Sequence, residues 1–308
     1  MPKTQKETVI KIENLDKSFG KIRVLDDVNI EIYKGEVFGF LGPNGAGKTT
    51  TIRVLLNVLH PSSGTVEIFG IPSKKTKRIH KRIGYLSADM VLDDDISAKR
   101  YLSLINRSYG GGFKDRIESL ADLFEIDLNE KIRNYSRGNQ QKIGLISAIL
   151  HKPELLIFDE PTSGFDPIMQ QAFTKMVLDF KKRGGTILMS SHILSEVQQL
   201  CDRVAFIKEG NVIGVQSLTS AKGKTTKRVI VNPSPAASKQ IETKYKSLAG
   251  LTLLKKSKTQ LVFAYTGDVN KLLKFFSAQN IEDIMIEEPD LEEAFLHYYK
   301  NNSESKNV

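Results

Sequence analysis

The chain has 308 residues, of which 40% are hydrophobic and 26% charged, and its net charge is +9. These values are typical of a globular protein with one large domain or two of ordinary size. Its apolar runs are too short to span a bilayer, its first residues are too polar for a secretory signal, and Cys201, the only cysteine, excludes an intramolecular disulfide and fits a reducing compartment.

The excess of positive charge has three interpretations: a nucleic-acid surface, proximity to anionic lipid, and scattered solvated side chains. Basic residues cluster at 74–82 and 222–228. Stacking aromatics do not alternate with them, so the pattern does not favour a nucleic-acid platform. We therefore expect no nucleic-acid partner, while a solvated face and a nearby anionic membrane both stay open.

The first predicted elements are two strands of alternating polarity, Val9–Asn14 and Val28–Tyr33, which would form an antiparallel flap. A buried strand is expected at Glu36–Leu41. The next residues, 42–49, read Gly-Pro-Asn-Gly-Ala-Gly-Lys-Thr and fit G-x-x-x-x-G-K-[ST], and a helix is expected to follow from Thr50. This strand, loop and helix are the context in which the motif binds nucleotide phosphates.

Glycines in such a loop let backbone N–H groups surround a phosphate, and the helix N-terminus adds the positive end of its dipole. The Lys48 side chain would reach the β and γ phosphates, and the Thr49 hydroxyl would bind Mg²⁺. The candidate phosphate-binding residues are Gly42, Pro43, Asn44, Gly45, Ala46, Gly47, Lys48, Thr49 and Thr50.

Most of the segment 85–150 has helical periodicity, after a short strand expected at 65–69. The expected helices are 97–109, 114–124 and 136–150. Strands and helices then alternate, with strands at 155–158, 186–190, 203–208 and 211–215 and helices at 168–183 and 193–201. This alternation predicts an α/β fold with a mainly parallel sheet covered by helices.

The periodicity restarts after a lysine-containing stretch of small residues. The order β-α-β-β-α-β over 228–287 predicts a small ferredoxin-like α+β domain, followed by a helix at 291–300. The predicted division is a first domain at 8–216 with a helical subdomain at 85–150, a linker at 217–227, an accessory domain at 228–300 and a disordered tail at 301–308. We hypothesise that the accessory domain contributes a dimerisation or regulatory surface.

Two further sites carry chemistry. An apolar strand ends in Asp159 and Glu160; the first suits an Mg²⁺ ligand and the second is placed to polarise an attacking water. The stretch Tyr135–Lys142 puts small residues at a helix start, which favours an anion site. Taken alone, the acidic pair could be solvated acids at a strand end, and the second stretch an ordinary capped helix.

The ordered set of motifs resembles the nucleotide-binding subunits of ATP-binding cassette (ABC) transporters. The loop at 42–49 resembles Walker A, and 136–140 resembles the signature motif, usually Leu-Ser-Gly-Gly-Gln. The strand 155–160 resembles Walker B with its catalytic glutamate, 163–166 resembles the D-loop, and His192 resembles the switch histidine. The resemblance covers about residues 9–215.

The resemblance implies a P-loop NTPase cassette that closes on ATP as a head-to-tail dimer. Ser136 and Gly138 would act in trans on the γ-phosphate, and Asp166 would belong to the nucleotide site through the D-loop. His192 would contact the γ-phosphate and hold Glu160 in place, although a lone histidine is more often a surface or core residue. Phe19 resembles the aromatic residue that stacks on adenine, with buried packing as the alternative.

Two departures from the family pattern stand out. Arg137 takes the place of a glycine in the signature motif, and Asn139 that of a glutamine. The glutamine of the family's Q-loop, which binds Mg²⁺, is also absent, and the stretch reads Ser-Ala-Asp up to Asp89. We hypothesise that Asp89 supplies the missing metal ligand; a plain surface aspartate is the alternative.

These features predict the ATPase subunit of a bacterial exporter, bound to the cytoplasmic face of the membrane. Its partners would be a separate permease, contacted through 85–150, and an identical or related cassette, and its cofactors ATP and Mg²⁺. The end of the chain, near Leu291–Phe295, resembles the branch that exports antibiotics, bacteriocins and sodium. The alternative is a soluble cassette ATPase acting on ribosomes or DNA, but the chain has one cassette and lacks sustained heptads between Thr49 and Ser136.

Overall fold

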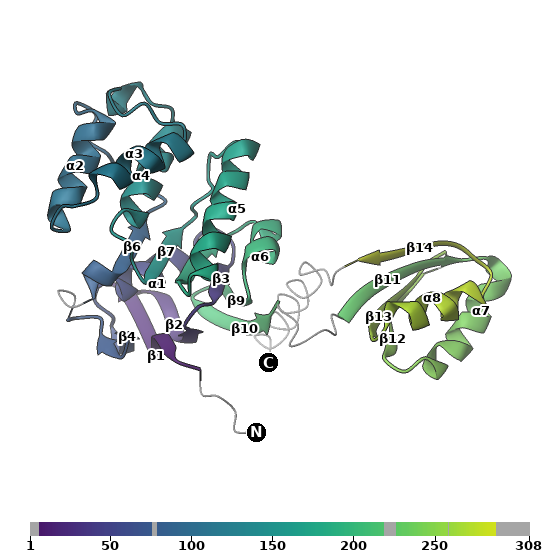
Figure 1. The fold of residues 1–308 in the computed structure, drawn as a ribbon. Coiled ribbons are helices and arrows are strands. Elements are labelled where there is room, and N and C mark those ends of the chain that lie inside the picture. Colours follow the sequence, from purple (N-terminus) through teal and green to yellow (C-terminus); the bar gives the residue numbers. More distant parts are fainter. Residues whose placement is uncertain (1–5, 76–78, 219–225, 258, 288–308) are drawn as a thin grey trace. The chain divides into compact units, whose positions relative to one another are not determined.

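The computed structural model describes residues 6–75, 79–218, 226–257 and 259–287. The chain divides into two compact units, 1–216 and 217–308, and this division falls at the start of the predicted linker. Each unit is considered by itself (Figure 1). The predicted helix at 291–300 and tail at 301–308 lie outside the described residues, as does most of the linker.

The centre of the first unit is a six-stranded sheet in the order β10-β9-β3-β8-β7-β6. Its strands are β3 (Val37–Leu41), β6 (Ile83–Leu86), β7 (Leu155–Asp159), β8 (Thr186–Ser191), β9 (Arg203–Lys208) and β10 (Asn211–Ser217). The neighbours β9-β3, β3-β8, β8-β7 and β7-β6 are parallel, as predicted. Every residue of β3, β7 and β8 is buried, which explains their continuous apolar sequences.

The flap is a second sheet, in the order β2-β1-β4-β5, with antiparallel pairing. Its strands are β1 (Thr8–Phe19), β2 (Ile22–Tyr33), β4 (Ser63–Ile68) and β5 (Ile71–Pro72). The predicted antiparallel flap is confirmed, but β1 and β2 are much longer than expected. Register shifts interrupt the pairing of β1 with β2. The strict polar–apolar alternation that indicates a strand is therefore lost over part of their length.

Helix α1 (Lys48–Leu55) follows β3 directly, and α5 (Pro167–Lys182) and α6 (Leu194–Leu200) lie beside the core sheet. Figure 1 shows α2 (Ala98–Ser108), α3 (Lys114–Leu123) and α4 (Arg137–Ile149) grouped together, away from the flap. Across the described residues, no helix is long and apolar enough to cross a membrane.

The sequence predicted a helical segment beginning at Tyr85, but the structure has a strand there. Tyr85 and Leu86 belong to β6 and pair with β7 in the core sheet. The four-residue strand is too short for its period to be seen, and it contains Gly84. A Cβ on Gly84 would lie 2.0 Å from the carbonyl oxygen of Ala148, so this glycine lets α4 approach the sheet.

The second unit has β11 (Thr226–Pro233), α7 (Pro235–Lys244), β12 (Leu251–Lys256), β13 (Leu261–Thr266), α8 (Val269–Ser277) and β14 (Ile281–Glu287). Its sheet has the order β12-β13-β11-β14 and antiparallel pairing throughout. This is the predicted ferredoxin-like arrangement. Its core includes Val229, Ile241, Phe263 and Phe276. Helix α7 is followed directly by a 3-10 turn at Tyr245–Ser247.

Candidate active site

The phosphate-loop residues form a tight loop between β3 and α1. Gly45 and Gly47 have φ angles of +78° and +107°, in the left-handed region that favours glycine. Gly42 follows β3 and packs tightly against Ile207, since a Cβ on Gly42 would lie 2.4 Å from the carbonyl oxygen of that residue. The glycines that define the motif are therefore also those that the backbone path requires.

Lys48 begins α1, and its side chain is only 5% exposed. Its Nζ donates hydrogen bonds to the carbonyl oxygens of Gly42, at 2.6 Å, and Pro43, at 3.2 Å. The same nitrogen lies 3.0 Å from Oε1 of Glu160, at ion-pair distance. A buried ammonium needs such compensation. Lys48 thus connects the loop to the end of β7.

Asp159, at the end of β7, is fully buried. Its Oδ1 accepts a hydrogen bond of 2.6 Å from Ser190 Oγ, which in turn accepts one of 3.0 Å from the backbone N–H of Glu160. Oδ2 of Asp159 is buried and has no hydrogen-bond partner among the described residues. Buried carboxylate oxygens are normally satisfied, so this one is suited to a cation or an ordered water.

The oxygen atoms of Asp159 and Thr49 are suitable ligands for Mg²⁺. The free Oδ2 of Asp159 and the hydroxyl of Thr49, the second residue of α1, are both oxygen ligands, which Mg²⁺ prefers. The described residues contain no group of three or more His, Cys, Asp or Glu side chains that could hold a metal. Mg²⁺ usually combines one or two protein ligands with phosphate and water.

Glu160 is held from both sides. Its Oε2 lies 2.6 Å from Nδ1 of His192, while Oε1 faces Lys48. Because an ionised carboxylate only accepts, the contact with His192 places a proton on Nδ1. Glu160 also has a φ angle of +50°, an uncommon conformation for a non-glycine residue that is enriched at functional sites. The three residues predicted to be catalytic therefore meet in one place.

Sequence reasoning missed a residue that joins the two segments carrying Glu160 and His192. Glu196, in the first turn of α6, accepts a hydrogen bond of 2.5 Å from Thr162 Oγ1 on Oε1 and one of 3.0 Å from Ser191 Oγ on Oε2. Thr162 lies two residues after Glu160, and Ser191 immediately precedes His192. The only sequence signal was an acidic residue one helical turn after the histidine.

The signature residues lie at the start of α4. Ser136 is its N-cap, and its Oγ accepts a hydrogen bond of 3.2 Å from the backbone N–H of Asn139. A Cβ on Gly138 would lie 3.0 Å from the carbonyl oxygen of Gly164, so the signature turn packs closely on the D-loop of the same chain. Arg137 is exposed at this end of the helix.

Two predicted site residues have other partners in the structure. Asp166 is the N-cap of α5, where its Oδ1 accepts a hydrogen bond of 2.8 Å from the N–H of Met169. The exposed carboxylate of Asp89 lies 3.6 Å from Nη2 of Arg53. Within the described residues, no hydrogen bond or ion pair joins Asp89 to Thr49 or Asp159. The metal role of Asp89 stays a prediction without structural support.

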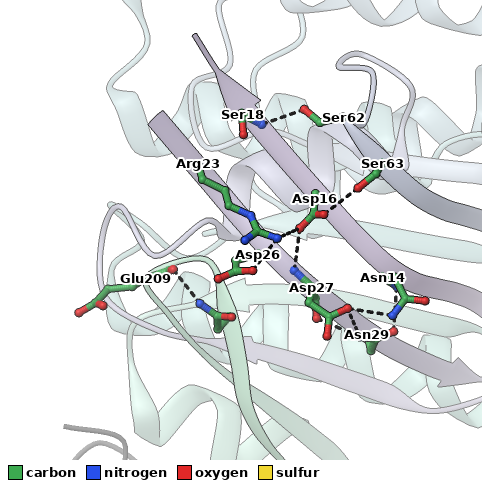
Figure 2. A network of polar contacts seen from close by, with 11 residues as sticks. Asn14, Asp16, Ser18, Arg23, Asp26, Asp27, Asn29, Ser62, Ser63 and Glu209 are labelled. Carbon is green, nitrogen blue, oxygen red and sulfur yellow. Dashed lines mark hydrogen bonds and ion pairs between the residues drawn. The ribbon is translucent and has the colours of Figure 1, made fainter. Parts of the chain in front are cut away.

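Phe19 ends β1 and is 46% exposed, which does not fit the alternative of buried packing. Lys17 Nζ lies 4.8 Å from the centre of its ring. Figure 2 shows a polar network of the flap in which Asp16 accepts hydrogen bonds from Arg23, from Ser63 and from the backbone N–H of Asp27. These bonds, the one from Asp27 first, lower the pKa of Asp16 to about 2. The network fixes the turn that presents Phe19.

Comparison with known proteins agrees with this geometry. The sequence profile of the family described as ABC transporter matches residues 25–163. The chain is 40% identical over 210 residues to the bacitracin transport ATP-binding protein BcrA of Bacillus licheniformis, covering 67% of this chain and 69% of that protein. It is 36% identical to the lantibiotic transport ATP-binding protein SrtF of Streptococcus pyogenes, covering 67% of this chain and 89% of SrtF.

Solved structures extend the similarity to the fold. An ATP-binding subunit of an ABC transporter superposes with a TM-score of 0.65 at 28% identity, covering 68% of this chain and 90% of that one. The cassette MJ0796 in a dimeric post-hydrolysis state, bound to ADP and Pi, has a TM-score of 0.64 at 22% identity, covering 69% of this chain and all of that one. The second likeness concerns the fold alone.

Proposed function

The chain belongs to the ABC transporter family as an ATP-binding, ATP-hydrolysing subunit, and from this premise we propose that it drives export of a small molecule, peptide or ion through a separate permease. The exporter assignment is supported by the similarity to BcrA and SrtF, the ATP-binding proteins of bacitracin and lantibiotic transport. The observation that carries the ATPase site is the Glu160 carboxylate, shared between Lys48 and His192.

In the proposed mechanism, Lys48 moves from the loop carbonyls and Glu160 to the phosphates of ATP. This exchange neutralises phosphate charge and leaves the Glu160 carboxylate free to accept the proton of an attacking water. His192, whose Nδ1–H already points at Oε2, keeps the carboxylate oriented. Mg²⁺, when bound, would add positive charge at the phosphates, held by Thr49 and Asp159.

The proposed working form is a pair of cassettes. Ser136 and Gly138 of one copy would face the phosphate loop of the other. The supporting observations are that α4 begins there, that a helix N-terminus favours anions, and that Ser136 is exposed. Asp166 would contribute to this shared nucleotide site by capping α5 and so holding the D-loop beside the signature turn. Exposed Arg137 adds a further positive charge at this end of α4.

We propose that the permease docks on a groove between the core sheet and α2. The groove has a volume of about 350 Å³ and an aromatic and apolar lining, formed by Leu56, Val58, His80, Ile83, Tyr85, Tyr101, Ile105, Tyr109, Ser147 and Ala148. Val58 is 67% exposed there. An apolar surface of this kind is typical of a partner interface. A permease bound here would place the protein at the cytoplasmic face of the membrane.

The direct test of this function is to search the reading frames beside this gene for a membrane protein and to co-express that protein with the chain. The two should co-purify, and ATP hydrolysis by the complex should exceed that of the cassette alone. Val58→Asp should abolish co-purification and leave basal hydrolysis unchanged, while Ile22→Asp, at an equally exposed flap residue, should keep both. A complex that is unaffected by Val58→Asp would disprove the docking site.

A further inference from the structure

A second hollow, of about 590 Å³, lies at the edge of the core sheet opposite the phosphate loop. Its wall includes Glu154 and Thr186, at the starts of β7 and β8, whereas Asp159 and Ser191 end these strands at the active site. The flap contributes Val9 and Phe69, and α3 and the end of α5 close the other sides. Nothing in the mechanism above uses this hollow.

The lining is strongly basic, with five cations against two carboxylates: Lys34, Arg82, Arg116, Lys152 and Arg183 against Glu7 and Glu154. Both carboxylates are already paired. Arg82 binds Glu154 through two hydrogen bonds, of 2.6 and 2.8 Å, and Lys34 Nζ lies 2.8 Å from Glu7. Among the described residues, no acidic side chain pairs with any of the remaining three cations.

Arg116 is the most constrained of the three. Its Nη2 donates a hydrogen bond of 3.1 Å to the carbonyl oxygen of Ile149, but its buried Nε–H has no acceptor. Burial, and then the neighbouring charge of Arg183, lower the pKa of Arg116. A half-buried guanidinium with an unused donor, in the same lining as a second guanidinium, is an arrangement that an oxyanion would stabilise.

We propose that this hollow binds a small free oxyanion carrying phosphate or carboxylate groups, through Arg116, Lys152 and Arg183. Its volume is in the range of pockets that hold small-molecule ligands. Phe180, Met176 and Pro153 supply apolar walls, which lower the local dielectric constant and strengthen charge-assisted bonds. The planar donors of two arginines match the geometry of carboxylate and phosphate.

The test uses the full chain saturated with ADP in metal-free buffer, so that the phosphate loop is occupied. Citrate and inorganic pyrophosphate serve as probes in calorimetric titrations. We expect both to bind, and Arg116→Ala or Arg183→Ala to weaken binding about tenfold or more. Arg116→Lys keeps the charge but loses the planar set of donors, so it should also weaken binding. Each variant should still bind ADP as the parent does, which excludes misfolding.

Lys182→Ala is the matched control, because Lys182 neighbours Arg183 on the exposed end of α5 and is not part of the hollow. It should leave the affinity for both probes within about twofold of the parent value. Equal losses for Lys182→Ala and Arg183→Ala would reveal general charge attraction and overturn the site. Absence of binding by both probes up to about 10 mM would overturn it as well.

Discussion

Lys48 Nζ lies 3.0 Å from Oε1 of Glu160, so the cation expected to bind phosphate is paired with the carboxylate expected to activate water. The two roles exclude each other while this pair persists. Nucleotide binding must therefore break an ion pair whose lysine is almost fully buried. The catalytic carboxylate becomes available only when phosphate has taken its partner.

This competition predicts that Glu160→Gln binds a non-hydrolysable ATP analogue about tenfold more tightly than the parent protein. The reason is that Lys48 in the variant has no ion pair to break before it contacts phosphate. Equilibrium titration measures the effect. Glu154→Gln is the matched control, since Glu154 pairs with Arg82 at the opposite edge of the sheet. A weaker affinity in Glu160→Gln would contradict the competition.

Glu196 is expected to act as a positioning residue for Glu160 and His192. Its removal in Glu196→Ala should lower kcat about tenfold and leave KM for ATP nearly unchanged, because small displacements of catalytic groups are costly. Glu196→Gln can still accept one of the two hydrogen bonds and should recover part of the rate. Gln199→Ala, on the exposed side of α6, should behave as the parent. A rise in KM with unchanged kcat would show that Glu196 serves binding instead.

Phe19 is expected to stack on the base. Phe19→Ala should weaken ATP binding about tenfold, in line with the usual contribution of one aromatic–base stack, and Phe19→Tyr should restore it. Ile22→Ala, at the 69% exposed neighbour in the same turn, is the control. The affinity for tripolyphosphate, which has no base, should not change in any of these variants. A parallel loss for tripolyphosphate would mean that the turn had been distorted.

Asp16 should make the flap sensitive to acid. Because hydrogen bonds lower its pKa from 3.8 to about 2, its ionised form stabilises the folded state above pH 3.8, and this contribution is lost as the pH falls through 2. Asp16→Asn should therefore be less stable to urea than the parent at pH 7, and the difference should shrink between pH 4 and 2. A difference that does not vary with pH would exclude this role.

The sequence was most informative where the functional residues are consecutive in the chain. The loop at 42–49 and the pair Asp159–Glu160 could be found because neighbouring residues both define the motif and shape the backbone. The contacts of Ser190 and Glu196 could not, since single hydrogen bonds join segments that are far apart in the chain. Tyr85 was assigned to the wrong element because β6 is too short to have a visible period.

The predicted place of Asp89 illustrates a different limit. The family's Q-loop glutamine is absent, and Asp89 is the residue hypothesised to take its metal role as an oxygen ligand. Its carboxylate lies 3.6 Å from Arg53 on the surface, and its role as a metal ligand stays a prediction. Motif alignment places a residue along the chain but does not decide which of several charged neighbours its side chain will contact.

We propose that two copies of the chain close over ATP and that Glu160 drives hydrolysis. The most direct test of this proposal is sedimentation of Glu160→Gln with and without Mg-ATP, together with its hydrolysis rate. We expect an ATP-dependent dimer and a hydrolysis rate lowered by about a hundredfold or more. A variant that stays monomeric with ATP bound, or that hydrolyses ATP at the parent rate, would contradict it.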